Sequence, residues 1–174
     1  MRIDIVGAPA SGKSTLAAAI AKKLSIPHIH LDRFWFESGG RQSKQVTPNI
    51  EQVRAKIREK TLEAIKAEAW VSDGTYLHVQ NEVVSRADVL IFLDIPLGYR
   101  VLNHAKRAFL KPKMHKEVSA WDDITFFIEL IRRAYTSGSK LRNFVNEHTD
   151  KAVILRSNKE INNYLNGLLT PRRR

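Results

Sequence analysis

The chain of 174 residues contains no cysteine. This absence excludes a disulfide-stapled scaffold, a zinc site built on thiolates and a thiol nucleophile. Apolar runs are short as well, since the run 89–93 already ends at Asp94, whereas about 20 apolar residues are needed to cross a bilayer. The first apolar stretch is interrupted by Asp4 and leads directly into a Gly/Ser/Lys loop, unlike the core of a signal peptide. We therefore expect a cytoplasmic protein without a membrane segment.

Acidic residues are also scarce relative to basic ones. The chain has 18 Asp and Glu against 29 Lys and Arg, a formal net charge of +11, so an anionic partner is expected. Hydrophobic residues make up 43% and charged residues 27%, which is the balance of an ordinary globular protein. The length predicts a single domain over 1–174, ending in a basic tail at 171–174.

Short β-rich runs alternate with longer segments of helical periodicity, and this alternation predicts an α/β fold. Thr47 and Pro48 have the residue types favoured at a helix N-cap and first turn. The predicted strands are 1–6, 28–31, 70–73, 89–93 and 152–155. The predicted helices are 16–24, 47–68, one opening at Pro96, 119–135 and 159–168.

The motif with the clearest chemistry lies between the first predicted strand and the first predicted helix. It is a complete G-x-x-x-x-G-K-[ST] phosphate-binding loop in the strand–loop–helix context that the motif requires. Backbone N–H groups of such a loop and of the helix N-terminus form an anion hole for phosphates. The predicted nucleotide-binding residues are Gly7, Ala8, Pro9, Ala10, Ser11, Gly12, Lys13, Ser14 and Thr15.

Three side chains of this segment have distinct expected roles. Lys13 supplies a mobile positive charge that follows the β- and γ-phosphate oxygens, and the Ser14 hydroxyl suits Mg²⁺ as a ligand. Thr15 either contacts the α-phosphate or is a plain helix residue.

Several other classes of P-loop protein are disfavoured. Helicases and large ring-forming ATPases carry an Asp-Glu pair after a strand, whereas Gly74 follows Asp73 and Ile95 follows Asp94. GTPases read guanine with Asn-Lys-x-Asp, but residues 158–161 are Asn-Lys-Glu-Ile and lack the base-reading carboxylate.

The chain resembles the nucleoside and nucleotide kinase group of P-loop proteins, which includes adenylate kinase, and within it most closely the topology modulation proteins. The matching stretches are 7–14, 28–32, 70–76 and 87–96. The resemblance implies a three-layer P-loop NTPase fold, with a five-stranded parallel sheet, helices on both faces and a helical lid at 97–118. It also implies phosphate transfer from ATP with Mg²⁺, and it leaves the acceptor and the donor base open.

The resemblance further implies roles for individual residues. Asp73 corresponds to the acid that holds Mg²⁺ through water, although a turn cap is the alternative. Asp32 ends the second strand, where similar kinases hold the acceptor, and is expected to bind or deprotonate an acceptor hydroxyl. Arg100 and Arg107 are expected to neutralise the triphosphate from the lid, and Asn158 is placed near the adenine.

Two further assignments keep their alternatives. Arg33 with the aromatic residues 34–36 forms either an acceptor pocket or part of the core. The basic stretch 97–116 is either the lid, with Arg132 and Arg133 as second choices for phosphate contacts, or a solvated face. Asn103 departs from the pattern, because an arginine is the expected residue there.

These features support a small-molecule kinase in which Lys13, Asp32, Arg107 and Arg100 are the catalytic residues and Ser14 and Asp73 hold the metal. Two alternatives remain. One is a nucleic-acid-binding protein that affects DNA topology with ATP as a switch, favoured by the positive charge. The other is a nucleotide-binding protein without turnover.

Overall fold

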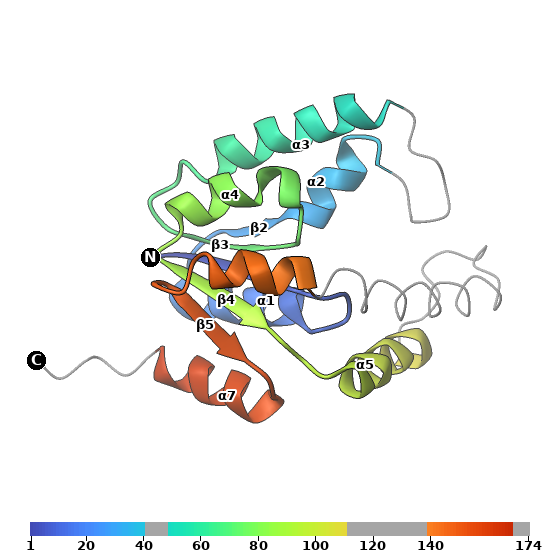
Figure 1. Cartoon of the computed structure of the whole chain (residues 1–174), viewed down its shortest axis with the longest axis vertical. Coiled ribbons are helices and arrows are strands. Elements are labelled where there is room, and N and C mark those ends of the chain that lie inside the picture. Colours follow the sequence, from blue (N-terminus) through green and yellow to red (C-terminus); the bar gives the residue numbers. More distant parts are fainter. Residues whose placement is uncertain (41–48, 111–138, 169–174) are drawn as a thin grey trace, which may run out of the picture.

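The computed structural model describes residues 1–40, 49–110 and 139–168, with the backbone alone for Leu77, His104 and 106–110. Five parallel strands form one sheet in the order β2-β3-β1-β4-β5 (Figure 1). The strands are β1 (Arg2–Gly7), β2 (His28–His30), β3 (Trp70–Asp73), β4 (Val89–Leu93) and β5 (Ala152–Leu155). The predicted α/β fold with a five-stranded parallel sheet is confirmed.

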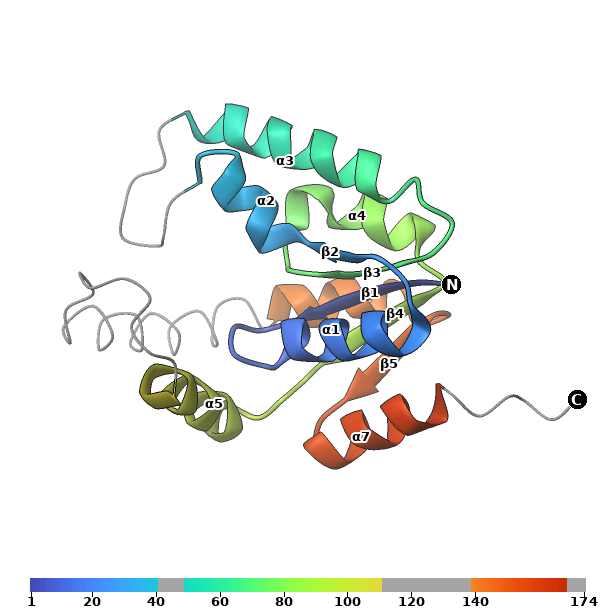
Figure 2. The same ribbon diagram turned by 180° about the vertical axis from the view of Figure 1, so that it is seen from behind.

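Helices cover both faces of this sheet (Figures 1 and 2). On one face, α1 (Lys13–Leu24) and α7 (Asn158–Gly167) pack over a core that includes Ile5 and Ile91. On the other face, α4 (Leu77–Arg86) and the helical segment 139–146 pack over Val6 and Phe92. Three layers result, because each face of a buried parallel sheet is apolar and must be covered.

The remaining helices extend the second face and one end of the sheet. α2 (Leu31–Glu37) directly follows β2 and packs against α3 (Ile50–Ala64), which in turn packs against α4. α5 (Leu97–Leu110) follows β4. The buried Trp70 of β3 contributes to the cluster beneath these helices.

The register of β1 decides where the functional side chains meet. β1 lies between β3 and β4, with Ile5 paired to Asp73 and Gly7 paired to Leu93. Since all strands are parallel, their carboxyl ends share one edge of the sheet, where ligands of such folds bind. The P-loop, Asp32, Asp73 and Asp94 are therefore brought to that edge.

The structure differs from the predicted elements in several places. α2, α4 and the segment 139–146 were not among the predicted helices. α3 begins after Asn49, whose φ is 52°, and it ends at Ala64 instead of reaching Glu68. Asn tolerates the left-handed conformation that this start requires. The predicted start at 47–48, the predicted helix 119–135, the lid residues 111–118 and the basic tail lie outside the described residues.

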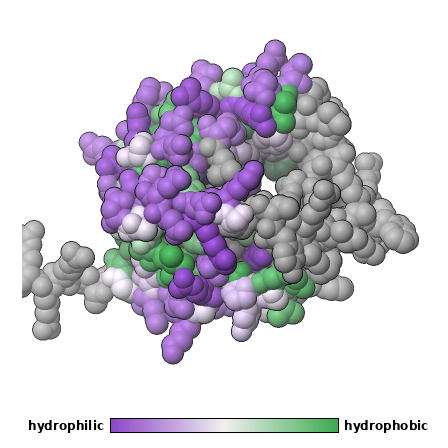
Figure 3. Space-filling model, viewed as in Figure 1, coloured by the Kyte–Doolittle hydropathy of each residue, from purple (hydrophilic) through white to green (hydrophobic). Residues whose placement is uncertain are grey.

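The described surface is mainly hydrophilic on the face in Figure 3, with scattered apolar patches. Among the described helices, none has both the length and the apolar character that a membrane crossing needs.

Candidate active site

The P-loop joins the buried strand β1 to α1. Its backbone is left-handed at Ala10 (φ 61°) and at Gly12 (φ 94°), a conformation that favours glycine. Gly7 is tightly packed, since a Cβ there would lie 2.8 Å from Ser11 Oγ and 3.0 Å from the Leu93 carbonyl oxygen. The first turn of α1, which is described throughout, carries no acidic side chain. The N-terminal end of α1 is therefore suited to bind phosphate.

Lys13 is turned back onto the loop. Its Nζ donates to the carbonyl oxygens of Gly7, at 2.9 Å, and Ala8, at 3.0 Å. These contacts hold the ammonium group over the loop. A bound phosphate has to compete with both carbonyls for it.

The buried Asp73 links the P-loop to β2. Ser14 Oγ donates to Asp73 Oδ2 at 2.5 Å. On the other oxygen, Oδ1, His28 Nε2 lies at 2.6 Å and His30 Nδ1 at 3.1 Å. The two imidazole rings stack with centroids 5.6 Å apart. The predicted metal pair, Ser14 and Asp73, is thus brought into direct contact.

The electrostatics favour the ionised form of Asp73. Burial alone raises its pKa, but the hydrogen bonds from His28 and Ser14 and the charge of His30 outweigh burial, and the net pKa lies below the ordinary value. Ser14 and Asp73 supply hard oxygen ligands, and Mg²⁺ typically takes one or two such protein ligands plus water and phosphate oxygens. The pair therefore fits the ligand chemistry of Mg²⁺. Among the described residues, no cluster of three or more His, Cys, Asp or Glu side chains is found.

Asp32 lies on α2 at the same edge of the sheet. The Tyr76 hydroxyl donates to Asp32 Oδ1 at 2.9 Å, and the rings of Tyr76 and Trp35 are 6.0 Å apart with a tilt of 32°. The aromatic residues 34–36 lie in three different environments. Phe34 packs against the core, and Trp35 is half-buried beside Tyr76. Phe36 is 53% exposed. One of the three therefore faces the predicted acceptor side.

The short segment 74–76 after β3 contacts both the P-loop and Asp32. Thr75 Oγ1 donates to the Gly7 carbonyl oxygen at 3.2 Å, and the next residue, Tyr76, reaches Asp32. Gly74 supplies the turn between them and β3, with a φ of 128°.

α5 brings the first part of the predicted lid to the P-loop. Asn103 Nδ2 donates to the Ala10 carbonyl oxygen at 3.3 Å. Arg100 is buried, and its Nε and Nη1 have no hydrogen-bond partner within the described structure. Burial lowers the pKa of Arg100, although Asp94 acts in the opposite direction. Arg107 lies in α5, but its side chain is outside the described structure, as are residues 111–118, Arg132 and Arg133.

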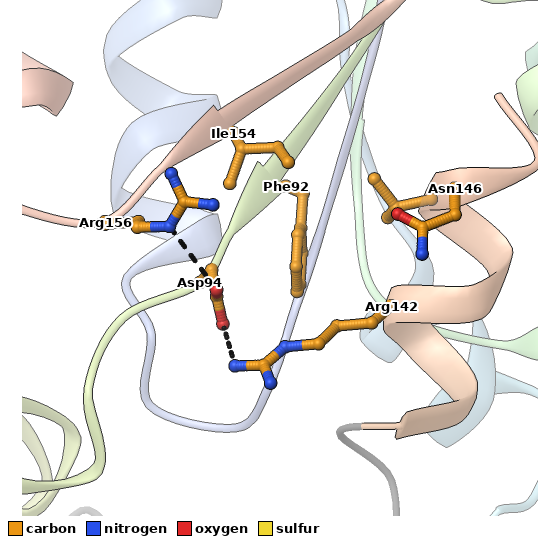
Figure 4. A pocket seen from close by; sticks show the side chains of 7 residues that line it. Phe92, Asp94, Arg142, Asn146, Ile154 and Arg156 are labelled. Carbon is orange, nitrogen blue, oxygen red and sulfur yellow. Dashed lines mark hydrogen bonds and ion pairs between the residues drawn. The ribbon is translucent and has the colours of Figure 1, made fainter. Parts of the chain in front are cut away.

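A cleft of about 370 Å³ lies where β4 and β5 end (Figure 4). Asp94 lies between two guanidinium groups, with Arg142 Nη2 at 3.0 Å and Arg156 Nε at 3.7 Å. Phe92 and Ile154 line its apolar part. The carboxylate of Asp94 thus forms ion pairs with Arg142 and Arg156.

Asn158 is the first residue of α7 and is exposed. The residue before it, Ser157, caps the helix by accepting a hydrogen bond from the backbone N–H of Glu160 at 3.2 Å. Glu160 Oε2 in turn accepts from the backbone N–H of Arg156 at 2.8 Å. This capping box fixes the start of α7 near the edge that carries the P-loop.

Comparison with solved structures shows which fold the sheet and its helices form. A shikimate kinase from Bacteroides thetaiotaomicron matches with a TM-score of 0.59 and 19% identity, covering 97% of this chain and 96% of that one. A shikimate kinase from Aquifex aeolicus matches with a TM-score of 0.52 and 20% identity, covering 97% of this chain and 94% of that one. The chain has a P-loop kinase fold.

Sequence comparison gives shorter matches. YqaC, an uncharacterized protein of Bacillus subtilis, is 34% identical over 110 residues, and the match spans 62% of this chain but only 56% of that protein's length. An adenylate kinase of Streptomyces griseus is 62% identical over 29 residues, or 17% of this chain and 81% of that sequence. No protein-family model matches. None of these matched proteins bears the name of a topology modulation protein, so that finer assignment stays a prediction.

The sequence analysis assigned no role to three polar residues that form a buried network: Asp4, Ser72 and Gln80. Asp4 is completely buried beneath the P-loop, where Ser72 Oγ donates to its Oδ1 at 2.6 Å and Gln80 Nε2 to its Oδ2 at 2.5 Å. Burial raises the pKa of Asp4 to about 7. Gln80 Oε1 also accepts from the backbone N–H of Tyr76 at 3.2 Å. The sequence feature that could have indicated this network is Asp4 itself, a carboxylate inside an otherwise apolar strand.

Gly74→Ala should destabilise the kinase fold by about 1–3 kcal/mol. A side chain at a φ of 128° is strained, and the added Cβ would lie 2.8 Å from Leu31 Cβ. Urea unfolding measures the loss. Gly98→Ala is the matched control, because a Cβ there meets nothing within 4 Å and alanine favours the helix. Equal stability of the two variants contradicts the prediction.

Proposed function

We propose that this chain is an ATP-dependent phosphotransferase that moves the γ-phosphate of Mg·ATP to a nucleotide, a nucleoside or a similar small acceptor. The supporting observation is the shared edge: Lys13 and Ser14 on the P-loop, Asp73 bonded to Ser14, and Asp32 tied to the P-loop through residues 74–76. A phosphate site and an exposed carboxylate on the same edge are the parts that a phosphotransferase needs.

The proposed roles follow from the chemistry of each group. The P-loop backbone and Lys13 bind the β- and γ-phosphates, and Ser14 and Asp73 would hold Mg²⁺. When bound, Mg²⁺ supplies positive charge next to the phosphate oxygens. Asn158 lies near the donor base, with contacts from the backbone rather than the side chain. The hydrogen bond from Asn103 to the Ala10 carbonyl oxygen keeps α5 close to the loop.

Phosphate transfer requires little covalent work from the protein, since positioning and charge compensation dominate. With a hydroxyl acceptor, the acceptor oxygen attacks the γ-phosphorus, its proton passes to Asp32, and the bond from the γ-phosphorus to the bridging oxygen breaks. ADP leaves with that oxygen. Water must be excluded during this step, because water is a competing acceptor, and we assign the exclusion to the lid that begins with α5.

Arg107→Ala should lower kcat by about 10²-fold while changing the dissociation constant of ATP by less than about threefold. A lid arginine acts on charge that builds up during transfer, so its loss affects the transition state more than ground-state binding. Single-turnover rates and equilibrium ATP binding separate the two effects. Arg54→Ala, on the exposed side of α3, is the control. Equal losses in rate and in ATP affinity would show that Arg107 binds ATP in the ground state and does not act specifically on the transition state.

The proposed function is tested by ADP release from Mg·ATP across a panel of nucleoside monophosphates, nucleosides and small hydroxy acids. Duplex DNA is added as a further arm, and Lys13→Ala is the control. One acceptor should raise ADP release strongly in the wild type and leave Lys13→Ala unchanged. Stimulation by DNA alone would favour the nucleic-acid alternative, and tight ATP binding without turnover would favour a non-catalytic protein.

A further inference from the structure

We propose that His28 is a positioning residue for the magnesium site and that His30 supports it there. His28 acts through Asp73: it holds one carboxylate oxygen, so that the other oxygen orients the hydroxyl group of Ser14. The proposal rests on the proposed function, because it takes Ser14 and Asp73 to hold Mg²⁺. It goes further by giving the two histidines of β2 control over how tightly that cation is bound.

The register of the sheet places both histidines beside Asp73. β2 and β3 are parallel neighbours in which His30 lies opposite Asp73 and His28 lies opposite Val71, two positions earlier. Side chains two residues apart in a strand point to the same face of the sheet. The two imidazoles therefore meet the same carboxylate, and their rings stack with centroids 5.6 Å apart and planes tilted by 16°.

A chain of hydrogen bonds leads from His28 to Ser14. Asp73 is completely buried, and its ionised carboxylate can only accept hydrogen bonds. His28 Nε2 therefore carries the hydrogen in its 2.6 Å contact with Oδ1, while Ser14 Oγ donates to Oδ2 at 2.5 Å. Because the single hydroxyl proton of Ser14 is directed at Asp73, the lone pairs of Oγ remain available for a cation.

The two histidines have unequal parts in this chain. His30 Nδ1 lies 3.1 Å from Asp73 Oδ1 but has no hydrogen-bond partner within the described structure, so His28 is the residue that bonds this oxygen. Without His28, Oδ1 is a buried acceptor that lacks a donor, which is unfavourable. The carboxylate then turns both oxygens toward the Ser14 hydroxyl, and the orientation of that hydroxyl is no longer fixed.

Core packing does not account for the two histidines. Ile29 between them points to the opposite face of the sheet and is the residue of β2 that belongs to the core. The side chains of His28 and His30 remain 24% and 39% exposed, although both meet a completely buried carboxylate. A strand that only filled space at this place would carry apolar residues, so the pair is explained by its contact with Asp73.

The test measures how much Mg²⁺ strengthens the binding of a non-hydrolysable ATP analogue to the full chain. Calorimetric titrations in excess Mg²⁺ and in EDTA give two dissociation constants, and their ratio is the magnesium gain. In His28→Leu this gain should fall by about tenfold or be lost, as expected when the partner of a ligating carboxylate is removed. His28→Gln keeps a side-chain N–H donor and should keep most of the gain, and His30→Ala should lose less than His28→Leu.

The control variant is His148→Leu, which makes the same replacement elsewhere. His148 is half-buried, and its ring meets Phe144 with centroids 5.0 Å apart, so this variant should keep the full magnesium gain. Binding of the analogue in EDTA should match the wild type in every variant, because the metal-free phosphate site is intact. A wild type without a magnesium gain, a full gain in His28→Leu, or equal losses in His28→Leu and His28→Gln each overturns the proposal.

Failure of the proposed function looks different from failure of this proposal. If the magnesium gain falls in His28→Leu and persists in His28→Gln, but no acceptor raises ADP release, the positioning role stands and phosphate transfer is wrong. If an acceptor raises ADP release while His28→Leu keeps the full gain, phosphate transfer stands and the positioning role is wrong.

Discussion

Replacing Lys13 with methionine should lower the rate of phosphate transfer by about 10³-fold or more, as expected when a charge aimed at the reacting phosphate is lost. Methionine keeps most of the side-chain volume but cannot make the contacts of Nζ to Gly7 and Ala8. The fold should survive, since the P-loop is also fixed by Thr75 and Asn103. The measurement is the single-turnover rate with the acceptor that the panel identifies.

The control for Lys13 lies on the same helix. Lys22 is exposed in the last turn of α1, so Lys22→Met removes the same charge from the chain without touching the loop, and the rate should stay at the wild-type value. Comparable losses in the two variants would trace the effect to net charge rather than to the phosphate site.

The second large effect concerns Asp4 and the dependence of stability on pH. The pKa of Asp4 is raised by burial to about 7 in the folded chain, against an ordinary value near 4 in the unfolded chain. The folded state thus binds a proton that the unfolded state has released, so the contribution of Asp4 to stability is present below about pH 4 and is lost as the pH rises to about 7. The loss is on the order of 4 kcal/mol.

Asp4→Asn removes this titration. The unfolding free energy of the wild type minus that of Asp4→Asn should fall as the pH rises from about 4 to about 7, because other carboxyl groups contribute to both proteins and cancel. Asp88→Asn is a control in which the pH dependence has the opposite sign. The hydrogen bond from Arg2 lowers the pKa of Asp88, so the unfolding free energy of the wild type minus that of Asp88→Asn should rise with pH. Denaturant unfolding at several pH values gives the differences, and parallel curves for wild type and Asp4→Asn would exclude a buried carboxyl that titrates near neutrality. A carbon NMR titration of Asp4 in the wild type should have its midpoint near pH 7.

The strands were predictable because each is a short apolar run with a clear end. β5 (Ala152–Leu155) and β3 (Trp70–Asp73) match their predicted bounds, and the P-loop motif placed the turn between β1 and α1. α4 was harder to predict, because the polar Gln80 occupies a completely buried position on it and obscures the apolar face. α2 is short and begins directly at the end of β2, where the sequence pattern indicated strand followed by loop.

The same distinction holds for the candidate site. Lys13, Ser14, Asp32 and Asp73 were found because their residue types follow strands or complete a motif. Tyr76 could not be assigned from sequence, since its role depends on a hydroxyl that reaches Asp32 across 44 positions of the chain. The pairing of Asp4 with Ser72 likewise exists only through the register of β1 and β3.

That register also constrains how the protein can assemble during synthesis. The strand that leads into the P-loop is made well before both of its hydrogen-bonding neighbours, since Asp4 pairs with Ser72 and Gly7 pairs with Leu93. Pairings between distant positions slow folding and leave strand edges exposed in the meantime. A nascent chain that stops short of β4 therefore has the complete motif in its sequence but lacks the strand that pairs with Gly7 at the start of the P-loop, and one edge of β1 stays exposed until β4 is made.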